Sequence, residues 1–555
     1  MTQHSAHSAF DRGVALSRMA EEDFDLLVIG GGITGAGVAL DAASRGLRTA
    51  LVERGDFAAG TSSKSSKLVH GGLRYLQQRE FALVYENLAE RQRLLENAPH
   101  LVSVLPFLIP LFGRDGVLNK SVAKAYSTAL WLYDLTGGVR IGRRHRRISR
   151  EEALAHLPTL RADLLSAGFL YFDARADDAR LTLGVLRTAV LDHGAVAANH
   201  AGVTGLRREA SGRVREACLA DGTEVRAAAF VNATGVWTDQ VMALAEGARQ
   251  ETIRPAKGVH LTVRRDRLPC DIAAVIPVLK DRRSVFVVPW GDAVYLGTTD
   301  TDYDGPLDEP CCTPEDVAYI LDAMNTFTTS ALTVDDVVGT WAGLRPLVRS
   351  ADSERTADLS RRHKLIRSAS GVITITGGKL TTYRKMAADT VDEVVRDLGR
   401  GARRSRTKHL QLRGAAGTNE LRRPDAADRL GTDPATLAHL VDRYGSEART
   451  LLAMVQADPD LGRPLAPGLP YLRAEVVHAT RYEMATTLED VLARRTRALL
   501  LDRNASVAAA PDAANLMAPE LGWSKAEIRD QVESFLRLAA REGAAAGLPA
   551  AGLLA

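Results

Sequence analysis

Cysteine is scarce in this chain of 555 residues. Cys218, Cys270, Cys311 and Cys312 are the four that occur, and no two form a C-x-x-C pair. Disulfide frameworks and cysteine-based metal sites need closely spaced sets, so neither is expected, and the sequence predicts no metal site. Such sparse cysteine is typical of a reducing compartment, and the neighbouring Cys311 and Cys312 are interpreted as incidental.

Long apolar runs are also missing. No stretch approaches about 18 uninterrupted apolar residues, and residues 1–22 lack the apolar core of a signal peptide. The sequence therefore predicts a cytoplasmic protein that spans no membrane, although it could lie on one. The net charge is only +3, which gives no reason to expect nucleic acid as a partner. At 555 residues we expect two or three compact regions.

A glycine-containing turn lies near the start of the chain. Residues 26–29 form an apolar run short enough for a buried strand, and residues 36–44 have a helix-like pattern. Between them, Gly30, Gly32 and Gly35 have the G-x-G-x-x-G spacing. The first glycine allows a tight turn, the second lets a pyrophosphate approach the backbone, and the third lets helix pack on strand. The N–H groups at the start of the helix would then face phosphate.

A second predicted strand, residues 48–52, ends at Glu53, whose carboxylate can accept hydrogen bonds from a ribose diol. The glycine spacing alone also occurs in ordinary Gly-rich turns, and Glu53 alone could be a solvated strand-end carboxylate. Strand, turn, helix, strand and acid occur here in register, which favours a βαβ dinucleotide site.

Later segments predict more of the same domain and a second sheet. An apolar strand at residues 229–231 leads into the small residues Ala233, Thr234 and Gly235. Residues 257–263, 284–290 and 293–299 alternate as strands of an antiparallel sheet that can roof a pocket. Residues 372–376 form a strand that passes through two glycines into a helix at 379–395, whose N-terminus can stabilise negative charge.

The chain changes character after Gly401, where a basic linker leads into helices. We place a boundary between residues 1–404 and 405–555 and expect helices at 437–444, 482–501 and 525–540. Residues 486–497 put arginines on a helix that also has an apolar face, which most simply indicates a packing helix with a solvated side. No catalytic constellation is predicted in this region.

A basic run, RIGRRHRRISR, occupies residues 140–150 after an amphipathic segment at 121–135. One interpretation is a solvated, flexible loop. The other is a cationic patch attracted to an anionic lipid surface, where each charge adds on the order of 1 kcal/mol.

The blocks IGGGITGAGVALDAASRG, TSSKSSKLVHGGLRYL, VNATGVWTD, KGVHL, GTTDTD, AGLRPL and GGKLTTYRKMA stand in the order seen in FAD-dependent glycerol-3-phosphate dehydrogenases. The chain resembles this family over nearly its whole length. The resemblance implies an α/β fold with an FAD-binding Rossmann-like domain of the glutathione-reductase and D-amino-acid-oxidase type, an antiparallel-sheet substrate domain and an all-α C-terminal domain.

The resemblance also implies the site residues. FAD would bind non-covalently with its pyrophosphate on the glycine turn and its ribose on Glu53. The matching cofactor positions are Gly30, Gly32, Gly35, Glu53, Thr61, Ser62, Ser66, Lys67, His70, Gly71, Gly72, Ala233, Thr234, Gly235, Gly378, Lys379 and Leu380. The matching substrate positions are Arg74, Tyr75, Arg345, Arg361 and Lys379, with His260, Arg345 and Lys379 as the catalytic set.

The implied reaction transfers a hydride from carbon 2 of sn-glycerol 3-phosphate to flavin, giving dihydroxyacetone phosphate. Among these residues His260 alone has an ordinary pKa suited to a base near neutral pH, so Arg345 is assigned to orientation and charge stabilisation. Each also has a structural interpretation: a satisfied core histidine, salt-bridge arginines at Arg74 and Arg345, and a helix-start lysine at Lys379.

The electron acceptor implied by the resemblance is a membrane quinone, reached by a chain lying on the inner face of the cell membrane. Two alternatives stay open. The protein could be an oxidase that uses oxygen and yields hydrogen peroxide, or a non-catalytic flavin-binding module whose helical region binds a partner. A homodimer is also left open.

Overall fold

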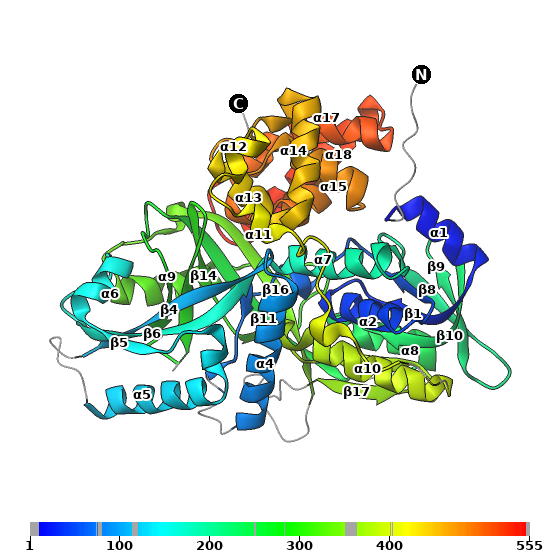
Figure 1. The fold of residues 1–555 in the computed structure, drawn as a ribbon, viewed down its shortest axis with the longest axis horizontal. Helices are drawn as coiled ribbons and strands as arrows, with labels where there is room; N and C mark the ends of the chain where they lie inside the picture. The colour runs from blue at the N-terminus through cyan, green and yellow to red at the C-terminus, as the bar shows by residue number, and fades with distance from the viewer. Residues whose placement is uncertain are drawn as a thin grey trace.

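The computed structural model describes residues 10–73, 75, 80–113, 120–248, 251–281, 283–349, 363–399, 401 and 403–550, and it places the glycine turn in an 8-stranded sheet (Figure 1). The strands run in the order β17-β18-β10-β1-β2-β7, in which β18, β10, β1, β2 and β7 are parallel to one another and β17 is antiparallel to β18. Their bounds are β1 Asp23–Ile29, β2 Thr49–Val52, β7 Val196–Ala198, β8 Val203–Arg208, β9 Val214–Leu219, β10 Glu224–Asn232, β17 Lys364–Arg367 and β18 Ile373–Thr376.

Helices cover both faces of this sheet, which explains why β1 reads as a continuous apolar run. Leu26 and Val28 pack against α2, α7 and α10, whereas Leu27 and Ile29 pack against α1 and α8. The predicted strand–turn–helix–strand unit is therefore present, although α2 begins at Ile33 and so includes Gly35 in its first turn. The helix bounds are α1 Arg12–Glu21, α2 Ile33–Ser44, α7 Asp178–Leu191, α8 Thr238–Glu246 and α10 Tyr383–Leu398.

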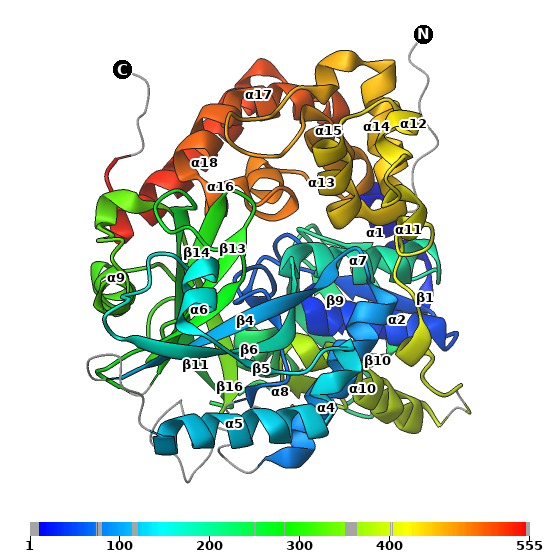
Figure 2. The ribbon, with the colours of Figure 1, turned by 60° about the vertical axis from the view of Figure 1, so that its left-hand side comes forward.

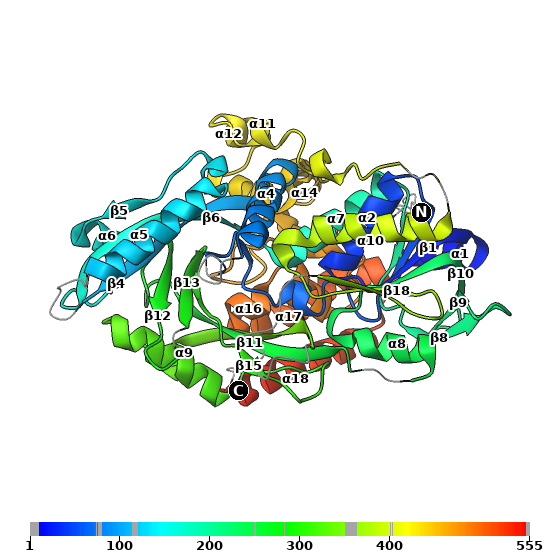
Figure 3. The ribbon, with the colours of Figure 1, turned by 90° about the horizontal axis from the view of Figure 1, so that it is seen from below.

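A second, 10-stranded sheet is mainly antiparallel, as predicted, with β12 and β4 as a parallel pair. Side chains alternate across it, so one face packs on α9 and the other on α4 and α5. Figure 3 shows α9 and α5 on opposite sides of the sheet. The bounds are β3 Leu68–Val69, β4 Val102–Phe112, β5 Arg146–Ile148, β6 Leu165–Ala176, β11 Ile253–Arg264, β12 Ala273–Pro277, β13 Ser284–Trp290, β14 Ala293–Gly297, β15 Thr301–Asp302, β16 Val337–Val348, α4 Phe81–Asn97, α5 Lys120–Leu135, α6 Arg150–His156 and α9 Pro314–Phe327.

The C-terminal region is helical and lies on the opposite side of the molecule from α5 (Figures 1 and 2). Its helices are α11 Thr418–Leu421, α12 Ala426–Leu430, α13 Pro434–Tyr444, α14 Ala448–Ala457, α15 Arg473–Tyr482, α16 Ala498–Leu501, α17 Arg503–Leu521 and α18 Lys525–Ala545. Among the described residues, no helix combines the length and apolar character needed to cross a bilayer.

The predicted continuous helix at residues 482–501 is wrong. The chain leaves α15 through Met484, at φ +53°, forms a π-helical turn over Asp490–Arg495, and turns again at Arg497, at φ +70°. Two left-handed residues cannot lie inside one α-helix, so the segment is a series of short turns. Such a path lets arginines that follow one another in sequence point to different partners.

Candidate active site

A cavity of about 550 Å³ opens between the parallel sheet, the second sheet and α18. Its walls include the end of β1, the end of β2 and the start of the segment that leads into α10. The predicted cofactor residues that line it are Gly30, Gly32, Glu53, Thr61, Ser62, Ala233, Thr234, Gly235, Gly378, Lys379 and Leu380. The structure therefore brings together residues separated by up to about 350 positions in sequence, as βαβ folding requires.

The glycine turn leaves no room for larger residues. Gly30 has φ +113°, and a Cβ placed there would lie 2.7 Å from the carbonyl oxygen of Ala233. A Cβ on Gly35 would lie 1.8 Å from the Gly30 carbonyl oxygen. The third glycine of the motif thus allows α2 to approach the turn closely, which is the packing role predicted for it.

Glu53 follows β2 and lies beside this turn. Its carboxylate accepts hydrogen bonds from the backbone N–H groups of Gly31, at 2.7 Å, and Gly55, at 2.8 Å. Burial raises the pKa of Glu53, while these two backbone hydrogen bonds oppose the rise. The bonds fix the carboxylate at the cavity wall, where a ribose would approach.

The other predicted cofactor residues, Gly35, Ser66, Lys67, His70, Gly71 and Gly72, do not line the cavity. The Lys67 ammonium instead lies 3.1 Å from Asp178 Oδ1 and 3.1 Å from the Ser63 carbonyl oxygen. Burial, followed by the charge of Arg497, lowers the pKa of Lys67 to about 8. The backbone N–H of His70 donates to Thr381 Oγ1 at 3.2 Å, which joins this loop to the segment before α10.

His260 lies on β11 on the sheet face opposite α9. Its ring stacks on Trp341 with the centroids 4.7 Å apart, and its Nε2 lies 2.9 Å from Ser66 Oγ. Gly297 lies opposite on β14, where a Cβ would come within 2.3 Å of the ring. Burial lowers the pKa of His260 well below its usual value, and the charges of Lys67 and Arg345 lower it further. The imidazole is therefore neutral near pH 7.

Arg345 lies on β16 on the same face of the sheet. Its guanidinium donates to Asp300 Oδ1 at 2.9 Å and to Thr298 Oγ1 at 3.1 Å. It packs directly on Gly258, two residues before His260, where a Cβ would lie 2.4 Å from Arg345 Nη2. The glycine thus lets a guanidinium lie close to the imidazole.

Lys379 and Tyr75 form a second cationic contact, with the Lys379 ammonium 3.8 Å from the centroid of the Tyr75 ring. Lys379 lines the cavity, and so does Pro346, the residue after Arg345. The structure thus brings Tyr75 to Lys379 and Arg345 near His260, and of these four residues Lys379 lines the cavity. Arg74 and Arg361, predicted for the phosphate, lie outside the described residues.

Trp341 and Asp178 were missed by sequence reasoning. Trp341 stands within the AGLRPL-containing strand, but a single tryptophan in an apolar strand gives no signal beyond burial. Asp178 reads as an acid at the start of a helix, an ordinary position for one. Only the structure shows the tryptophan on His260 and the aspartate on Lys67.

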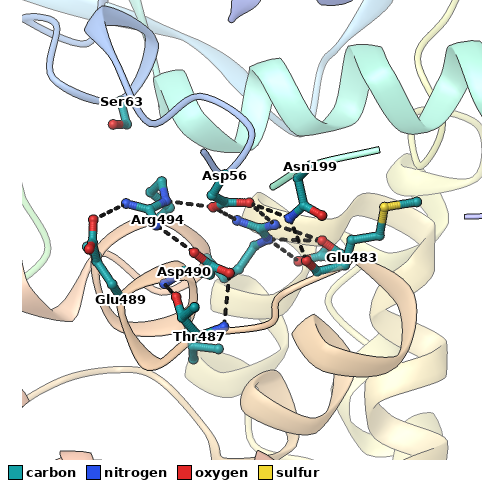
Figure 4. A network of polar contacts seen from close by, with 12 residues as sticks. Asp56, Ser63, Asn199, Glu483, Thr487, Glu489, Asp490 and Arg494 are labelled. Atoms are coloured by element: carbon teal, nitrogen blue, oxygen red, sulfur yellow. Dashed lines mark hydrogen bonds and ion pairs between the residues drawn. The ribbon is translucent and has the colours of Figure 1, made fainter. Parts of the chain in front are cut away.

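Buried charges join the C-terminal helices to the parallel-sheet region (Figure 4). Arg494 and Arg495 both donate to Asp56, at 2.6 Å each, and Arg494 also donates to Asp490 at 2.6 Å. These arginines are 6% and 2% exposed, so the predicted solvated side of this segment is wrong. Their shared partner Asp56 lies in the loop after β2, far away in sequence, which the local pattern could not show.

The cavity suits an extended dinucleotide. It runs from Glu53 past the glycine turn to Lys379 and the N-terminal side of α10. Backbone N–H groups and small residues of the glycine turn lie where a pyrophosphate needs them, and the Glu53 carboxylate lies where a ribose needs it. These residues would hold FAD, and Lys379 stands at the end of the cavity opposite Glu53.

This parallel sheet and cavity define an FAD-dependent oxidoreductase, and residues 25–384 match the family described as FAD dependent oxidoreductase. Residues 405–528 match the C-terminal domain of alpha-glycerophosphate oxidase. The chain is 42% identical over 536 residues to glycerol-3-phosphate dehydrogenase 2 of Mycobacterium tuberculosis, covering 95% of this chain and 89% of that one. The chain therefore belongs to the FAD-dependent glycerol-3-phosphate dehydrogenases, and its cofactor is FAD.

Solved structures agree with this assignment. The glycerol-3-phosphate dehydrogenase of Bacillus halodurans, solved with FAD, is 33% identical with a TM-score of 0.77, covering 96% of this chain and 97% of that one. The L-alpha-glycerophosphate oxidase of Mycoplasma pneumoniae is 18% identical with a TM-score of 0.54, covering 70% of this chain and 99% of that one. The second likeness concerns the fold alone.

Proposed function

We propose that this chain oxidises sn-glycerol 3-phosphate to dihydroxyacetone phosphate. The observation that carries the proposal is the pairing of neutral His260 with Arg345 and of Tyr75 with Lys379, which lines the dinucleotide cavity. The names of the relatives support the choice of substrate. When bound, FAD accepts the hydride that leaves carbon 2.

The phosphate end of the substrate needs cations and hydrogen-bond donors. In the proposal Lys379 and Tyr75 bind it, together with Arg74 and Arg361, as the family resemblance implies. A phosphate monoester carries nearly two negative charges at neutral pH, and each charge-assisted hydrogen bond contributes about 1.5–3 kcal/mol. Arg345, held by Asp300, would orient the substrate and stabilise negative charge on the oxygen at carbon 2.

His260 takes the hydroxyl proton in this proposal. We assign the tautomer in which Nε2–H donates to Ser66 Oγ, because that leaves the lone pair on Nδ1. Nδ1 is buried and has no hydrogen-bond partner among the described residues, so in the proposal it is the atom that accepts the hydroxyl proton. A neutral imidazole is the form a general base requires.

We propose a membrane quinone as the electron acceptor and the inner face of the cell membrane as the location. Exposed apolar side chains on α4 and α5 support a surface that meets lipid: Phe81 45%, Tyr85 56%, Trp131 50% and Leu135 77% exposed. The basic run lies beside them, with the Arg140 guanidinium 4.8 Å from the centroid of the Tyr85 ring.

The basic run is not the flexible loop of the first interpretation. Its residues Arg146–Ile148 pair with β6, and His145 Nδ1 lies 2.7 Å from Asp134 Oδ2. Arg143, Arg144 and Arg147 remain exposed on this ordered segment. A fixed row of cations beside exposed aromatic side chains is the pattern expected of a lipid-binding surface.

An oxidase that uses oxygen is the second candidate, because the C-terminal region matches a domain described from alpha-glycerophosphate oxidase. Rapid mixing decides between them. The enzyme is reduced anaerobically with glycerol 3-phosphate and then mixed with oxygen or with a soluble quinone analogue. We expect fast reoxidation by the quinone only. Fast reoxidation by oxygen with release of peroxide would show that the protein is an oxidase. Absence of flavin reduction by glycerol 3-phosphate would favour a non-catalytic module.

We also propose that the chain divides into residues 1–404, which hold the cofactor and both sheets, and residues 405–555, which are helical. The change from mixed sheets to helices and the two family matches support this division.

A further inference from the structure

The contacts that orient His260 converge on residues 63–67. Ser66 Oγ bonds His260 Nε2 at 2.9 Å. Trp341, which stacks on the imidazole, donates its indole N–H to the Ser65 carbonyl oxygen at 3.2 Å. Tyr295 donates its hydroxyl to the Ser66 carbonyl oxygen at 2.8 Å. The direction of the imidazole therefore depends on where this short segment lies.

One carboxylate holds the segment in place. Asp178, at the start of α7, accepts from the Ser65 N–H at 3.0 Å and the Ser65 hydroxyl at 2.7 Å. It also accepts from the Lys67 ammonium at 3.1 Å. Lys67 has φ +55°, a left-handed conformation that a lysine adopts only when its surroundings impose it. Asp178 and Lys67 thus determine the path of the backbone between them.

The C-terminal region supplies the last contact. Arg497 Nη2 donates to Asp178 Oδ1 at 2.5 Å and to the Ser63 carbonyl oxygen at 2.6 Å. It is 1% exposed, so water cannot replace these bonds. Three residues further on, the Leu500 carbonyl oxygen accepts from Thr262 Oγ1 at 2.7 Å. The same C-terminal turn therefore touches residues 63–67, which contact His260, and β11, the strand that carries it.

We propose that Arg497 is a positioning residue for His260, acting through Asp178 and residues 63–67. The C-terminal region would then contribute to the reaction without touching the substrate. This inference rests on the proposed role of His260 as the base.

The physical reason lies in the number of donors that Asp178 satisfies. With Arg497 in place, the Asp178 carboxylate accepts hydrogen bonds from Arg497, Lys67 and Ser65, and together these contacts fix its orientation. Without the guanidinium, Asp178 can turn toward Lys67 alone, and the Ser63 carbonyl oxygen loses a buried donor. A shift of about 1 Å in a catalytic group can slow a reaction by about a hundredfold.

Arg497→Lys is the main test, with Arg495→Lys as the matched control. Arg495 is also nearly fully buried and also bonds across to the parallel-sheet region, but its carboxylate partner is Asp56. We expect both variants to melt at lower temperature. Only Arg497→Lys should slow flavin reduction at saturating substrate, by about ten- to a hundredfold, with KM within about twofold. Equal slowing in both variants would overturn the proposal.

Ser65→Ala provides a milder variant in case Arg497→Lys does not fold. It removes the 2.7 Å bond from the Ser65 hydroxyl to Asp178 and the 2.9 Å bond from the Lys67 backbone N–H to that hydroxyl, and it leaves the buried cations in place. We expect slower flavin reduction by about three- to tenfold at unchanged KM, in line with the loss of the two hydrogen bonds of this hydroxyl. A wild-type rate in Ser65→Ala would contradict the proposal.

A readout independent of turnover separates this inference from the proposed function. In the FAD-loaded enzyme with labelled histidine, the imidazole resonance of His260 is identified by its loss in His260→Gln. Arg497→Lys should shift it, and Arg495→Lys should not. An unshifted resonance refutes the positioning role. A shifted resonance together with an active His260→Gln refutes His260 as the base and leaves the positioning role standing.

Discussion

At the residue scale, the chemistry depends on a histidine that the fold keeps neutral. His260 is 2% exposed, stacked on Trp341, and close to the cations Lys67 and Arg345. Burial and like charge both oppose protonation, so the group retains a lone pair at a pH where a solvent-exposed histidine would begin to lose it. The sheet thus provides a base suited to an anionic substrate. Because the imidazole is neutral, the cations that attract the substrate can lie close to it without repulsion.

His260→Gln tests this role. We expect the rate of flavin reduction by glycerol 3-phosphate to fall by about 10²–10⁴-fold. In the wild-type enzyme the rate should fall only as the pH drops through the lowered pKa, so activity should persist below about pH 6.5. Stopped-flow absorbance at several pH values measures both. A wild-type rate in His260→Gln, or an acid limb at an ordinary histidine pKa, would contradict the assignment.

At the element scale, the approach of α2 to β1 depends on one glycine. Gly35→Ala places a methyl group 1.8 Å from the Gly30 carbonyl oxygen, where the neighbouring atom is backbone and cannot rotate away. We expect a loss of at least about 1–3 kcal/mol of stability and weakened retention of FAD, because α2 must move out. The measurements are thermal unfolding and the FAD content after desalting.

Gly401→Ala is the control for this change. A Cβ at Gly401 would meet nothing within 4 Å, so the variant should retain FAD and melt as the wild type does. If Gly35→Ala retains FAD and melts as the control does, the close approach of Gly35 to the Gly30 carbonyl oxygen is not required for the conformation of the glycine turn.

The elements of the parallel sheet were predictable because their signals are local. The strand at β1, the glycine turn and the acid after β2 follow one another within about thirty residues. By contrast, α17 contains Pro511 and Pro519, which disfavour a helix when sequence alone is considered. Tertiary packing of its alanines against the neighbouring helices overrides that preference.

The site was predictable from the family blocks but not from local physics. Nothing in the residues near Arg345 or Lys379 predicts their places beside His260 and Tyr75, because strand register and chain crossing decide them. The partners of Arg494 and Arg497 lie more than 300 positions away, at Asp56 and Asp178. Local periodicity predicts an apolar face and a charged face for the segment that carries these arginines. A charged face is normally solvated, so the pattern does not reveal that these ion pairs are buried.

At the scale of the whole molecule, the exposed basic segment lies on the side away from the C-terminal helices. Replacing Arg143, Arg144 and Arg147 together by Gln should weaken binding to anionic vesicles, since each charge contributes about 1 kcal/mol near the surface. Flotation at low and high salt measures this, and wild-type binding should weaken with salt.

Arg207→Gln, at another exposed arginine on β8, is the control for flotation and should bind as the wild type does. Binding that does not respond to salt or to the triple substitution would point instead to insertion of the exposed apolar side chains of α4 and α5.

The contact between the two regions also carries a pH dependence. Burial lowers the pKa of His200, but the hydrogen bond to Asp490 and the charges of Asp490 and Asp56 together outweigh burial and raise it. The contribution to stability is therefore complete below the unfolded pKa of about 6.5 and is lost as pH rises through the raised folded pKa. His200→Asn suits the left-handed backbone at φ +47°.

Thermal unfolding from about pH 6 to about pH 9 compares this variant with the wild type. We expect the wild type to melt higher at the acidic end and the two curves to converge as the pH rises. A difference that grows toward alkaline pH would show that His200 does not stabilise the contact as a cation.

Asp56 is 1% exposed and receives hydrogen bonds from both Arg494 and Arg495. A fragment ending at residue 404 would strip this carboxylate of both counter-ions and open to water the surface that the arginine-bearing segment covers. Truncation is therefore a poor way to isolate the flavin-binding half, and the two halves are better regarded as a single cooperative unit of folding.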